Sequence, residues 1–315
     1  MTDALKGKVA VVTGAGRGLG RAHALALSAE GAKVVVNDLG VAPDGSGAAA
    51  SVADDVVKEI KAKGGQAVAN YDSVTTAAGG EKIIKSALDA FGKLDILVNN
   101  AGFIRDRMVH NMSEEEWDAV IKVHLYGHFF CTKPACIVFR QQKTGGRIIN
   151  TSSAAGLGNM GQANYSAAKE GIVGFTRTVA RDMGRYGVTC NALYPGAATR
   201  MTMTPELQAA WQRMRAAGQP VPGDTDLIAP KMKPEYVSPW VVYLASDLSA
   251  NLNGYVFEVN MGTISIYSIP EPMRTIFKDV DKSGAWTFEE LKAIVPTTIA
   301  RGAVNPAPPA PPSKS

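Results

Sequence analysis

Short apolar runs alternate with longer segments of helical character along most of the sequence, and this alternation limits the possible folds more than any other feature. A strand that is covered on both faces of a sheet appears in a sequence as a short, continuous apolar run. Strands that alternate with helices predict a parallel sheet with helices packed on its two faces. The sequence therefore predicts a doubly wound α/β fold. The runs are KVAVVTG, AKVVVND, QAVANYD, LDILVNN, GRIINTS, VTCNALYPG and GYVFEVN.

The 315 residues, 46% of them hydrophobic, are enough for a large core. The alternation ends near residue 261, so residues 1–262 are expected to form a single domain. Within it, residues 197–235 carry several methionines and prolines and are expected to cover a substrate site, with ordinary surface packing as the alternative. Residues 263–300 are expected to form a C-terminal extension, and the proline-rich residues 301–315 a disordered tail.

The charge pattern argues against nucleic acid as a partner. The formal net charge of +4 is small, and the lysines and arginines are scattered along the chain. No apolar run approaches the roughly 18 residues of a membrane span, and the first residues lack the apolar centre of a signal peptide. The final SKS lacks the terminal leucine of a peroxisomal address. We therefore expect a soluble cytoplasmic protein, with Cys131, Cys136 and Cys190 as unpaired, buried side chains.

A glycine-rich turn, TGAGRGLG, follows the first apolar run and precedes a helical segment. Gly14, Gly18 and Gly20 allow a tight turn and the close approach of a pyrophosphate to the free amides of the helix. Arg17 and Leu19 lie between these glycines and belong to the same candidate cofactor site. The arrangement is typical of a dinucleotide site, although the glycines alone also fit a tight turn without a ligand.

An acidic residue, Asp38, ends the next apolar run, 18 residues after Gly20. A carboxylate in this place accepts hydrogen bonds from the adenosine ribose in Rossmann-type folds. Because it would repel a phosphate on that ribose, Asp38 favours NAD over NADP as the cofactor. Arg17 favours NADP instead, since a guanidinium in the turn would partly offset the repulsion between Asp38 and a ribose phosphate.

A serine, a tyrosine and a lysine form the candidate catalytic group. Tyr165 and Lys169 are one helical turn apart in NYSAAKEG, so their side chains share a face. Ser152 precedes Tyr165 by 13 residues and follows a predicted strand, where side chains face the ligand crevice. We expect the Lys169 ammonium and an oxidised nicotinamide to favour the phenolate of Tyr165. Tyr165 would then exchange a proton with an alcohol whose carbon exchanges hydride with the nicotinamide, and Ser152 would hold the oxygen. Each residue taken alone also fits an ordinary structural role.

In these motifs the sequence resembles the classical short-chain dehydrogenases, over roughly residues 5 to 262. TGAGRGLG, the later NNAG, and the group formed by Ser152, Tyr165 and Lys169 match the motifs of that family. The resemblance implies a one-domain Rossmann-type fold that assembles into homodimers or homotetramers. It also implies that Asp72 contacts the adenine and that Lys169 bonds the nicotinamide ribose. The other cofactor residues that it implies are Ser73, Asn99, Asn100, Ala101, Gly102, Tyr165, Pro195, Gly196 and Thr199.

A narrower resemblance rests on VVNDLG, NYDSV, NNAGFIRDRM, GQANYSAAK and KPEYVSP. These segments are similar to the (3R)-hydroxyacyl-CoA dehydrogenase part of peroxisomal multifunctional enzyme type 2, and more so to free-standing bacterial relatives linked to 17β-hydroxysteroids and steroid side-chain acyl-CoA oxidation. The implied substrate is a secondary alcohol of a 3-hydroxyacyl-CoA or of a 17β-hydroxysteroid, oxidised with NAD. Arg105 and Arg107 are either solvated surface charges or contacts for CoA phosphates. An NADPH-dependent 3-oxoacyl reductase and a non-catalytic nucleotide-binding partner subunit are the alternative functions.

One position departs from the family pattern. Members of the family usually carry an asparagine in the helical segment that reads KVHLYG here, where it binds a backbone carbonyl and a water of a proton relay. This chain has His124 instead. An imidazole can also hold the carbonyl or the water, so His124 belongs to the candidate catalytic group, with a purely structural role as the alternative.

Two patterns suggest metal ions, but neither is complete. Residues 279–290, DVDKSGAWTFEE, space their acidic side chains like a calcium loop, yet the preceding SIPEPMR makes a poor first helix for such a motif. His124 and His128 are one helical turn apart, without a third ligand near them in the sequence. We therefore predict no metal site.

Overall fold

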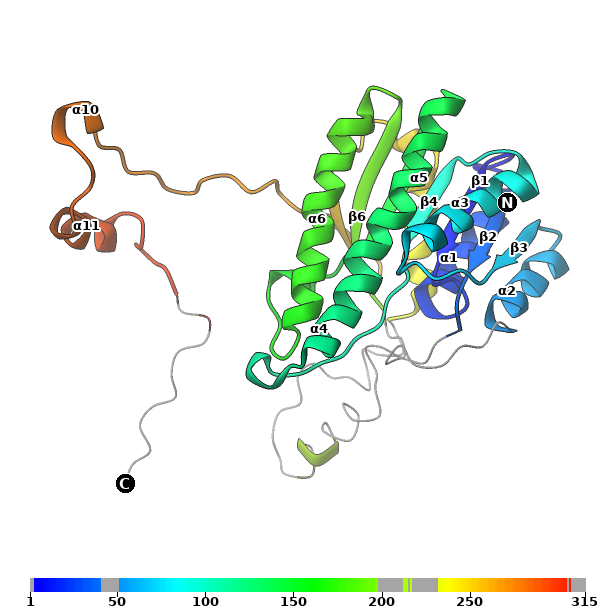
Figure 1. Ribbon diagram of the computed structural model, residues 1–315, viewed down its shortest axis with the longest axis horizontal. Coiled ribbons are helices and arrows are strands. Elements are labelled where there is room, and N and C mark those ends of the chain that lie inside the picture. The colour runs from blue at the N-terminus through cyan, green and yellow to red at the C-terminus, as the bar shows by residue number, and fades with distance from the viewer. Residues whose placement is uncertain are drawn as a thin grey trace. The chain divides into compact units, whose positions relative to one another are not determined.

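The computed structural model describes residues 3–40, 51–197, 212–214, 216, 232–304 and 306. Its centre is an eight-stranded sheet in the order β3-β2-β1-β4-β5-β6-β7-β8 (Figure 1). Every neighbouring pair of strands is parallel except β7 and β8, which are antiparallel. The strands are β1 (Val9–Thr13), β2 (Lys33–Asn37), β3 (Ala67–Asn70), β4 (Ile96–Asn99), β5 (Gly146–Thr151), β6 (Val188–Gly196), β7 (Val256–Asn260) and β8 (Thr263–Ile266).

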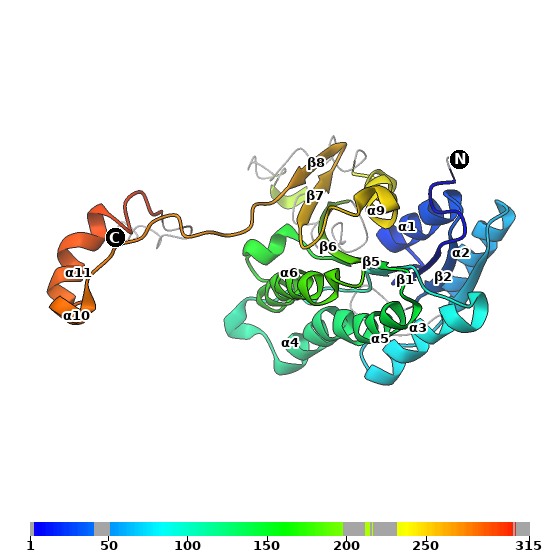
Figure 2. The same cartoon turned by 90° about the horizontal axis from the view of Figure 1, so that it is seen from above.

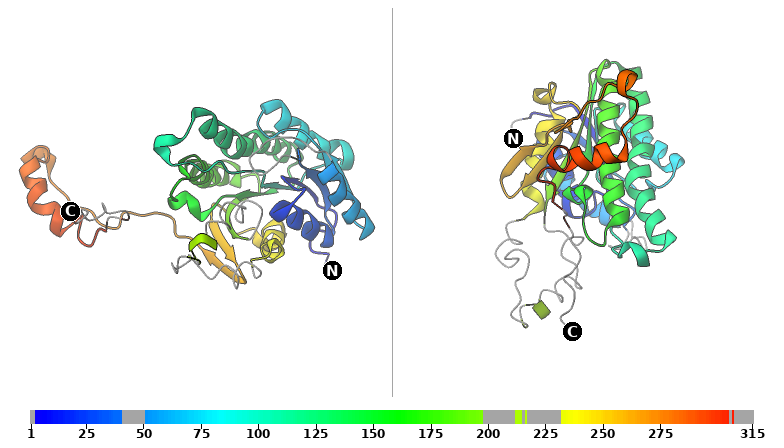
Figure 3. Two further views of the ribbon diagram at one scale, coloured as in Figure 1. Left: turned by 90° about the horizontal axis from the view of Figure 1, so that it is seen from below. Right: turned by 90° about the vertical axis from the view of Figure 1, so that its left-hand side faces the viewer.

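Helices cover both faces of this sheet (Figures 2 and 3). One buried cluster joins the sheet to α1, α2 and α9, and a second joins its other face to α3, α5 and α6. The described helices of this part are α1 (Gly18–Ala29), α2 (Ser51–Ala62), α3 (Ala77–Phe91), α4 (Glu114–Ile121), α5 (Gly127–Gln142), α6 (Ala163–Gly184) and α9 (Ser238–Ala245), with short turns η1 (Val109–Asn111), η2 (Lys122–Tyr126), η3 (Ala154–Leu157), η5 (Pro234–Tyr236) and η6 (Asp247–Ser249).

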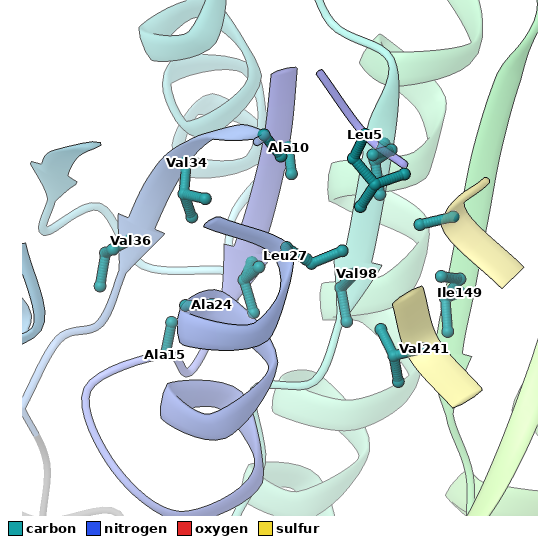
Figure 4. Close-up of a cluster of buried hydrophobic side chains, with 14 of the residues drawn as sticks. Leu5, Ala10, Ala15, Ala24, Leu27, Val34, Val36, Val98, Ile149 and Val241 are labelled. Carbon is teal, nitrogen blue, oxygen red and sulfur yellow. The ribbon is translucent and has the colours of Figure 1, made fainter. Parts of the chain in front are cut away.

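The two faces explain why the strands appear as continuous apolar runs in the sequence. Side chains alternate across a strand, so Ala10 and Val12 of β1 enter one cluster while Val9 and Val11 enter the other. Figure 4 shows the first of these clusters, in which side chains from β1, β2 and β4 pack against α1 and α9. Because both faces of each central strand are buried, consecutive positions favour apolar side chains, and the polar residues among them, such as Asn99 and Asn150, are hydrogen-bonded to each other. The predicted doubly wound α/β fold is confirmed.

The chain divides into two compact units, Met1–Tyr267 and Ser268–Ser315. Strand β8 adds the first residues after Met261 to the sheet, so the first unit reaches into the segment expected to form the extension. The second unit contains α10 (Val280–Ser283), α11 (Phe288–Ile294) and the turn η7 (Val295–Thr297). Thr287 and Glu290 close a capping box at the start of α11.

Most of the expected substrate cover, residues 197–235, and most of the expected tail, residues 301–315, lie outside the described residues. The described end of that cover is η5, which leads into α9. No helix in the described part of the chain has both the length and the apolar character needed to span a membrane.

Candidate active site

A cavity of about 610 Å³ lies where β1, β2, β3 and β4 end. In a doubly wound sheet, ligands bind beyond the carboxyl ends of the strands, so this is the place where the fold offers a site. Most of the cofactor residues expected from the sequence line this cavity: Gly14, Arg17, Gly18, Leu19, Gly20, Asp38, Asp72, Ser73, Asn100, Ala101 and Gly102.

The glycine turn between β1 and α1 is shaped by close backbone contacts. Gly14 has φ +63°, and a Cβ there would lie 2.7 Å from the Cα of Ala101. A Cβ at Gly20 would overlap the carbonyl oxygen of Gly14. Arg17, the N-cap residue of α1, makes no side-chain cap, so the first amides of the helix are not taken by a capping side chain. The turn therefore fits a pyrophosphate, which those amides can bind.

Asp38, just after β2, is fixed by the same turn. Its carboxylate accepts one hydrogen bond from the amide of Gly16 and one from the amide of Gly40, each at 2.7 Å. A Cβ at Gly16 would lie 2.8 Å from Oδ2 of Asp38. Sequence reasoning missed Gly16 because its role depends on a residue of the next strand. The hydrogen bonds from these two amides hold the carboxylate at the edge of the cavity, where it can accept hydrogen bonds from a ribose diol.

Six expected cofactor residues remain: Tyr165 and Lys169, which lie on α6 and are described below, and four others. Asn99 is buried, and its amide donates to Thr132 at 3.0 Å and to Asn150 at 2.9 Å, which ties β4 to α5 and β5. Pro195 and Gly196 end β6 and pair with β7. Thr199 lies outside the described residues. The role of Asn99 within the described structure is to hold the sheet together.

Lys169 and Tyr165 share one face of α6, as their spacing predicts. The Lys169 ammonium lies 5.3 Å from the centroid of the Tyr165 ring and donates to the carbonyl of Thr151 at 2.6 Å. Because the lysine is only 2% exposed, burial lowers its pKa to about 7. Near neutral pH the amine therefore changes charge readily.

The phenol of Tyr165 is also affected by burial. Burial raises its pKa to about 12, while a hydrogen bond with Ser153 acts in the opposite direction and the carboxylate of Asp106 adds to the rise. The expected joint effect of Lys169 and an oxidised nicotinamide on this phenol stays a prediction, because in the protein by itself the pKa is raised. The reason is that removing a phenolate from water costs more free energy than its neighbours return.

The serine beside the phenol is Ser153, and not the expected Ser152. Ser152 is 1% exposed, and its hydroxyl donates to the carbonyl of Lys169 at 2.6 Å. Ser153 has an extended backbone, accepts from the amide of Ala155 and is hydrogen-bonded to Tyr165. Neighbouring residues of an extended chain point to opposite sides. The two consecutive serines after β5 were the signal in the sequence, but a count of residues could not choose between them.

His124 lies at the centre of η2, a π-helical turn between α4 and α5. Its imidazole is fully buried, contacts the carbonyl oxygen of Phe103 at 2.7 Å, and meets the ring of Tyr165 edge-on with centroids 5.2 Å apart. A side chain at Gly102 would overlap the imidazole, so the glycine of NNAG makes room for it. Burial holds the pKa of His124 well below its usual range, and it is therefore neutral at neutral pH. As expected for an asparagine substitute, the imidazole holds a backbone carbonyl.

The segment after β4 and the residues that lead into α6 are joined to each other beside Tyr165, a pairing that the sequence did not predict. The amide of Arg107 donates to the carbonyl of Gly161 at 2.7 Å, and the Gln162 amide donates to both carboxylate oxygens of Asp106 at 3.0 Å. Asn164 donates to the carbonyl of Arg105 at 3.0 Å. The segment after β4 is thereby attached to the start of α6, next to Tyr165.

The described residues include no group of three or more metal-ligating side chains placed to hold an ion. In residues 279–290, the Glu290 carboxylate binds the Lys278 ammonium at 2.7 Å and the amide of Thr287 at 2.8 Å. His128 donates through Nδ1 to the carbonyl of His124 at 2.6 Å. These side chains therefore have structural partners within the protein.

Residues 8–210 match the family model described as short chain dehydrogenase. The hydroxyacyl-CoA dehydrogenase ChsB1 of Mycobacterium tuberculosis is 43% identical over 309 residues, which cover 93% of this chain and 88% of the relative. The mouse peroxisomal multifunctional enzyme type 2 is 48% identical over 261 residues, 82% of this chain, and the chain spans about a third of that protein's length, with 32% of it covered.

A solved structure of a short chain dehydrogenase from Mycobacterium avium is 45% identical and superimposes with a TM-score of 0.79 over 98% of both chains. The family model covers more than half of the sequence, and the fold and the motif geometry agree with it. The chain therefore belongs to the short-chain dehydrogenase family.

Proposed function

We propose that this protein is an NAD-dependent dehydrogenase that oxidises the secondary alcohol of a 3-hydroxyacyl-CoA. The observation that carries the proposal is the placement of Tyr165 and Lys169 on one face of α6, with Ser153 near enough to the phenol to lower its pKa, in a fold whose glycine turn and Asp38 line a cavity suited to a dinucleotide. Relatives that are 43% and 48% identical to this chain over the aligned residues bear names that refer to hydroxyacyl-CoA dehydrogenation or to a peroxisomal multifunctional enzyme. A 17β-hydroxysteroid is the second candidate substrate.

Tyr165 is proposed as the acid and base. In oxidation, its Oη receives the proton of the substrate hydroxyl, and in reduction it returns that proton. The Ser153 hydroxyl is suited to hold the substrate oxygen beside Oη, since it already forms a hydrogen bond with the phenol. We therefore propose Ser153, in place of Ser152, as the residue that holds the substrate oxygen.

Lys169 and His124 support the tyrosine from two sides. The Lys169 ammonium, with its low pKa, can release and recover a proton near neutral pH and is held by Thr151. His124 stays neutral and fixes the segment around Phe103. We propose that His124 holds the segment around Phe103 in place while it stays neutral, and that Lys169 is the group whose charge changes.

The cofactor would be held by the glycine turn at its pyrophosphate and by Asp38 at its adenosine ribose. Hydride transfer is the chemistry that a bound nicotinamide supplies. The Asp38 carboxylate is already fixed by two amides, which supports NAD over NADP and weighs against the alternative of an NADPH-dependent reductase. We further propose a homodimer or homotetramer in the cytoplasm, with residues 197–235 as the substrate cover.

The direct test is steady-state reduction of NAD and NADP with 3-hydroxyacyl-CoA thioesters of several chain lengths and with 17β-hydroxysteroids. The proposal expects turnover of the thioesters with NAD at a higher kcat/KM than with NADP. Turnover of the steroids alone would replace the substrate, and a preference for NADP would remove Asp38 from the cofactor argument.

A further inference from the structure

We propose that Arg105 and Lys122 form a phosphate-binding subsite for the CoA part of the substrate, next to the cofactor site. This inference rests on the proposed function, because it names the substrate class that the same cavity accepts. Apart from the residues that the family assigns to the cofactor, the cavity is also lined by Phe103, Arg105, Ala119, Lys122 and Val123. They come from the segment after β4, from α4 and from the π-helical turn η2.

Arg105 is held in position on the catalytic side of this cavity. Its backbone carbonyl accepts from Asn164, the residue before the catalytic tyrosine, and its guanidinium lies 5.7 Å from the centroid of the Phe103 ring. A guanidinium presents several donors in a plane, which suits a phosphate group. The side chain lines the cavity and is 26% exposed, so part of it is accessible to a ligand.

Lys122 adds a second cation to the same cavity, two residues before His124. Its side chain is 60% exposed, and its ammonium is 3.7 Å from the carboxylate of Asp118. Arg105 has a comparable partner, Glu115, at 3.0 Å. Both carboxylates are at least half exposed, and surface ion pairs of this kind contribute little free energy. A phosphate can therefore replace them at small cost.

A continuous series of contacts connects Arg105 to the reacting group. Arg105 lies against Phe103, Phe103 is bound through its backbone to His124, and the His124 ring meets Tyr165. A thioester whose alcohol is beside Tyr165 can extend its pantetheine along this side and present phosphates to the two cations. A steroid has no group that needs them, so the pair favours the CoA thioester.

Phosphates could come from the substrate or from the cofactor, and substrate truncation separates the two. Kinetics would be measured for a 3-hydroxyacyl-CoA and for the N-acetylcysteamine thioester of the same acid, which lacks phosphates. In the variants Arg105→Gln, Lys122→Gln and the double variant, the KM of the CoA thioester should rise relative to that of the short thioester. A rise of about tenfold in the double variant corresponds to the loss of two charge-assisted contacts. Lys85→Gln, on the exposed face of α3 and paired with Asp89, is the matched control.

An equal rise for both thioesters, or no rise, would refute the subsite. An increase confined to the KM of NAD would assign the two cations to the cofactor instead. Calorimetric binding of free CoA gives a readout that does not depend on turnover, and it should weaken about tenfold in the double variant. If the wild type binds CoA but does not turn over the thioesters, and the double variant binds CoA more weakly, the proposed reaction is wrong and the subsite stands. If the wild type is active and the double variant binds CoA as tightly as the wild type, the reaction stands and the subsite is wrong.

Discussion

Two neighbouring serines have different surroundings, and we propose a catalytic role only for Ser153. Ser153 contacts the phenol of Tyr165, and Ser152 supports the backbone of Lys169. We expect Ser153→Ala to lower kcat/KM by about 100-fold, the size of effect seen when one positioned donor is removed from a reacting oxygen. Ser152→Ala should retain most of the activity and lower the free energy of unfolding by about 1 to 3 kcal/mol, because a buried carbonyl loses its partner. Steady-state kinetics and urea unfolding of both variants check this, and the opposite ranking would restore Ser152.

At the same scale, Tyr165→Phe removes only the group that carries the proton. We expect loss of measurable turnover, while the affinity for NAD stays within a few-fold of the wild type, since the ring still packs against His124. Fluorescence titration with NADH provides the affinity. Activity that persists in this variant would show that the acid and base is a different residue.

Among the elements, the glycine turn is the one whose shape decides cofactor preference. A methyl group at Gly16 would press on Val52 and on the Asp38 carboxylate. We therefore expect Gly16→Ala to raise the KM of NAD about tenfold or more, with less effect on NADP, and Asp38→Ala to shift the preference in the same direction. Gly174→Ala on α6, where a Cβ would meet no atom within 4 Å, is the control. An unchanged ratio of the two KM values in both turn variants would contradict this role.

For the whole molecule, three fully buried histidines make stability depend on pH. Burial lowers the pKa of His23 and of His128 to about 3, and that of His124 well below its usual range. The unfolded chain therefore binds more protons than the folded one below about pH 6.5. Stability is present above that pH and is lost as the pH falls, by about 1.4 kcal/mol per unit for each histidine.

Unfolding in urea between pH 6.5 and 5.5 isolates these groups. The carboxylates with a lowered pKa, Glu59, Glu116 and Glu290, act mainly below this window. Lys169 acts above it, between its folded pKa of about 7 and its unfolded value. We expect His23→Asn to reduce the pH slope by about a third, since one of three groups is removed. His110→Gln, at an exposed position of η1, should leave the slope as it is. A flat profile in the wild type would mean that the three imidazoles become charged in the folded protein.

The order of the elements, the sheet type, the glycine turn and the placement of Asp38 could all be predicted, because each depends on local requirements. A strand buried on both faces needs apolar residues at consecutive positions, and a turn with φ +63° at Gly14 favours glycine whatever surrounds it. The one-turn spacing of Tyr165 and Lys169 is likewise a property of any helix. The strand β8 was not foreseen, because its four residues are exposed and have no buried face to leave a pattern.

What the sequence by itself determined was therefore the doubly wound fold, the family and the face of α6 that carries the phenol and the amine. Tertiary structure alone decided which serine reaches Tyr165, which carbonyl His124 holds, and how burial moves the two pKa values of the pair. These depend on the way β5 ends beside α6 and on how many atoms exclude water from the side chains. The position of β5 beside α6 and the exclusion of water both depend on segments far apart in the sequence, so no local sequence pattern predicts them.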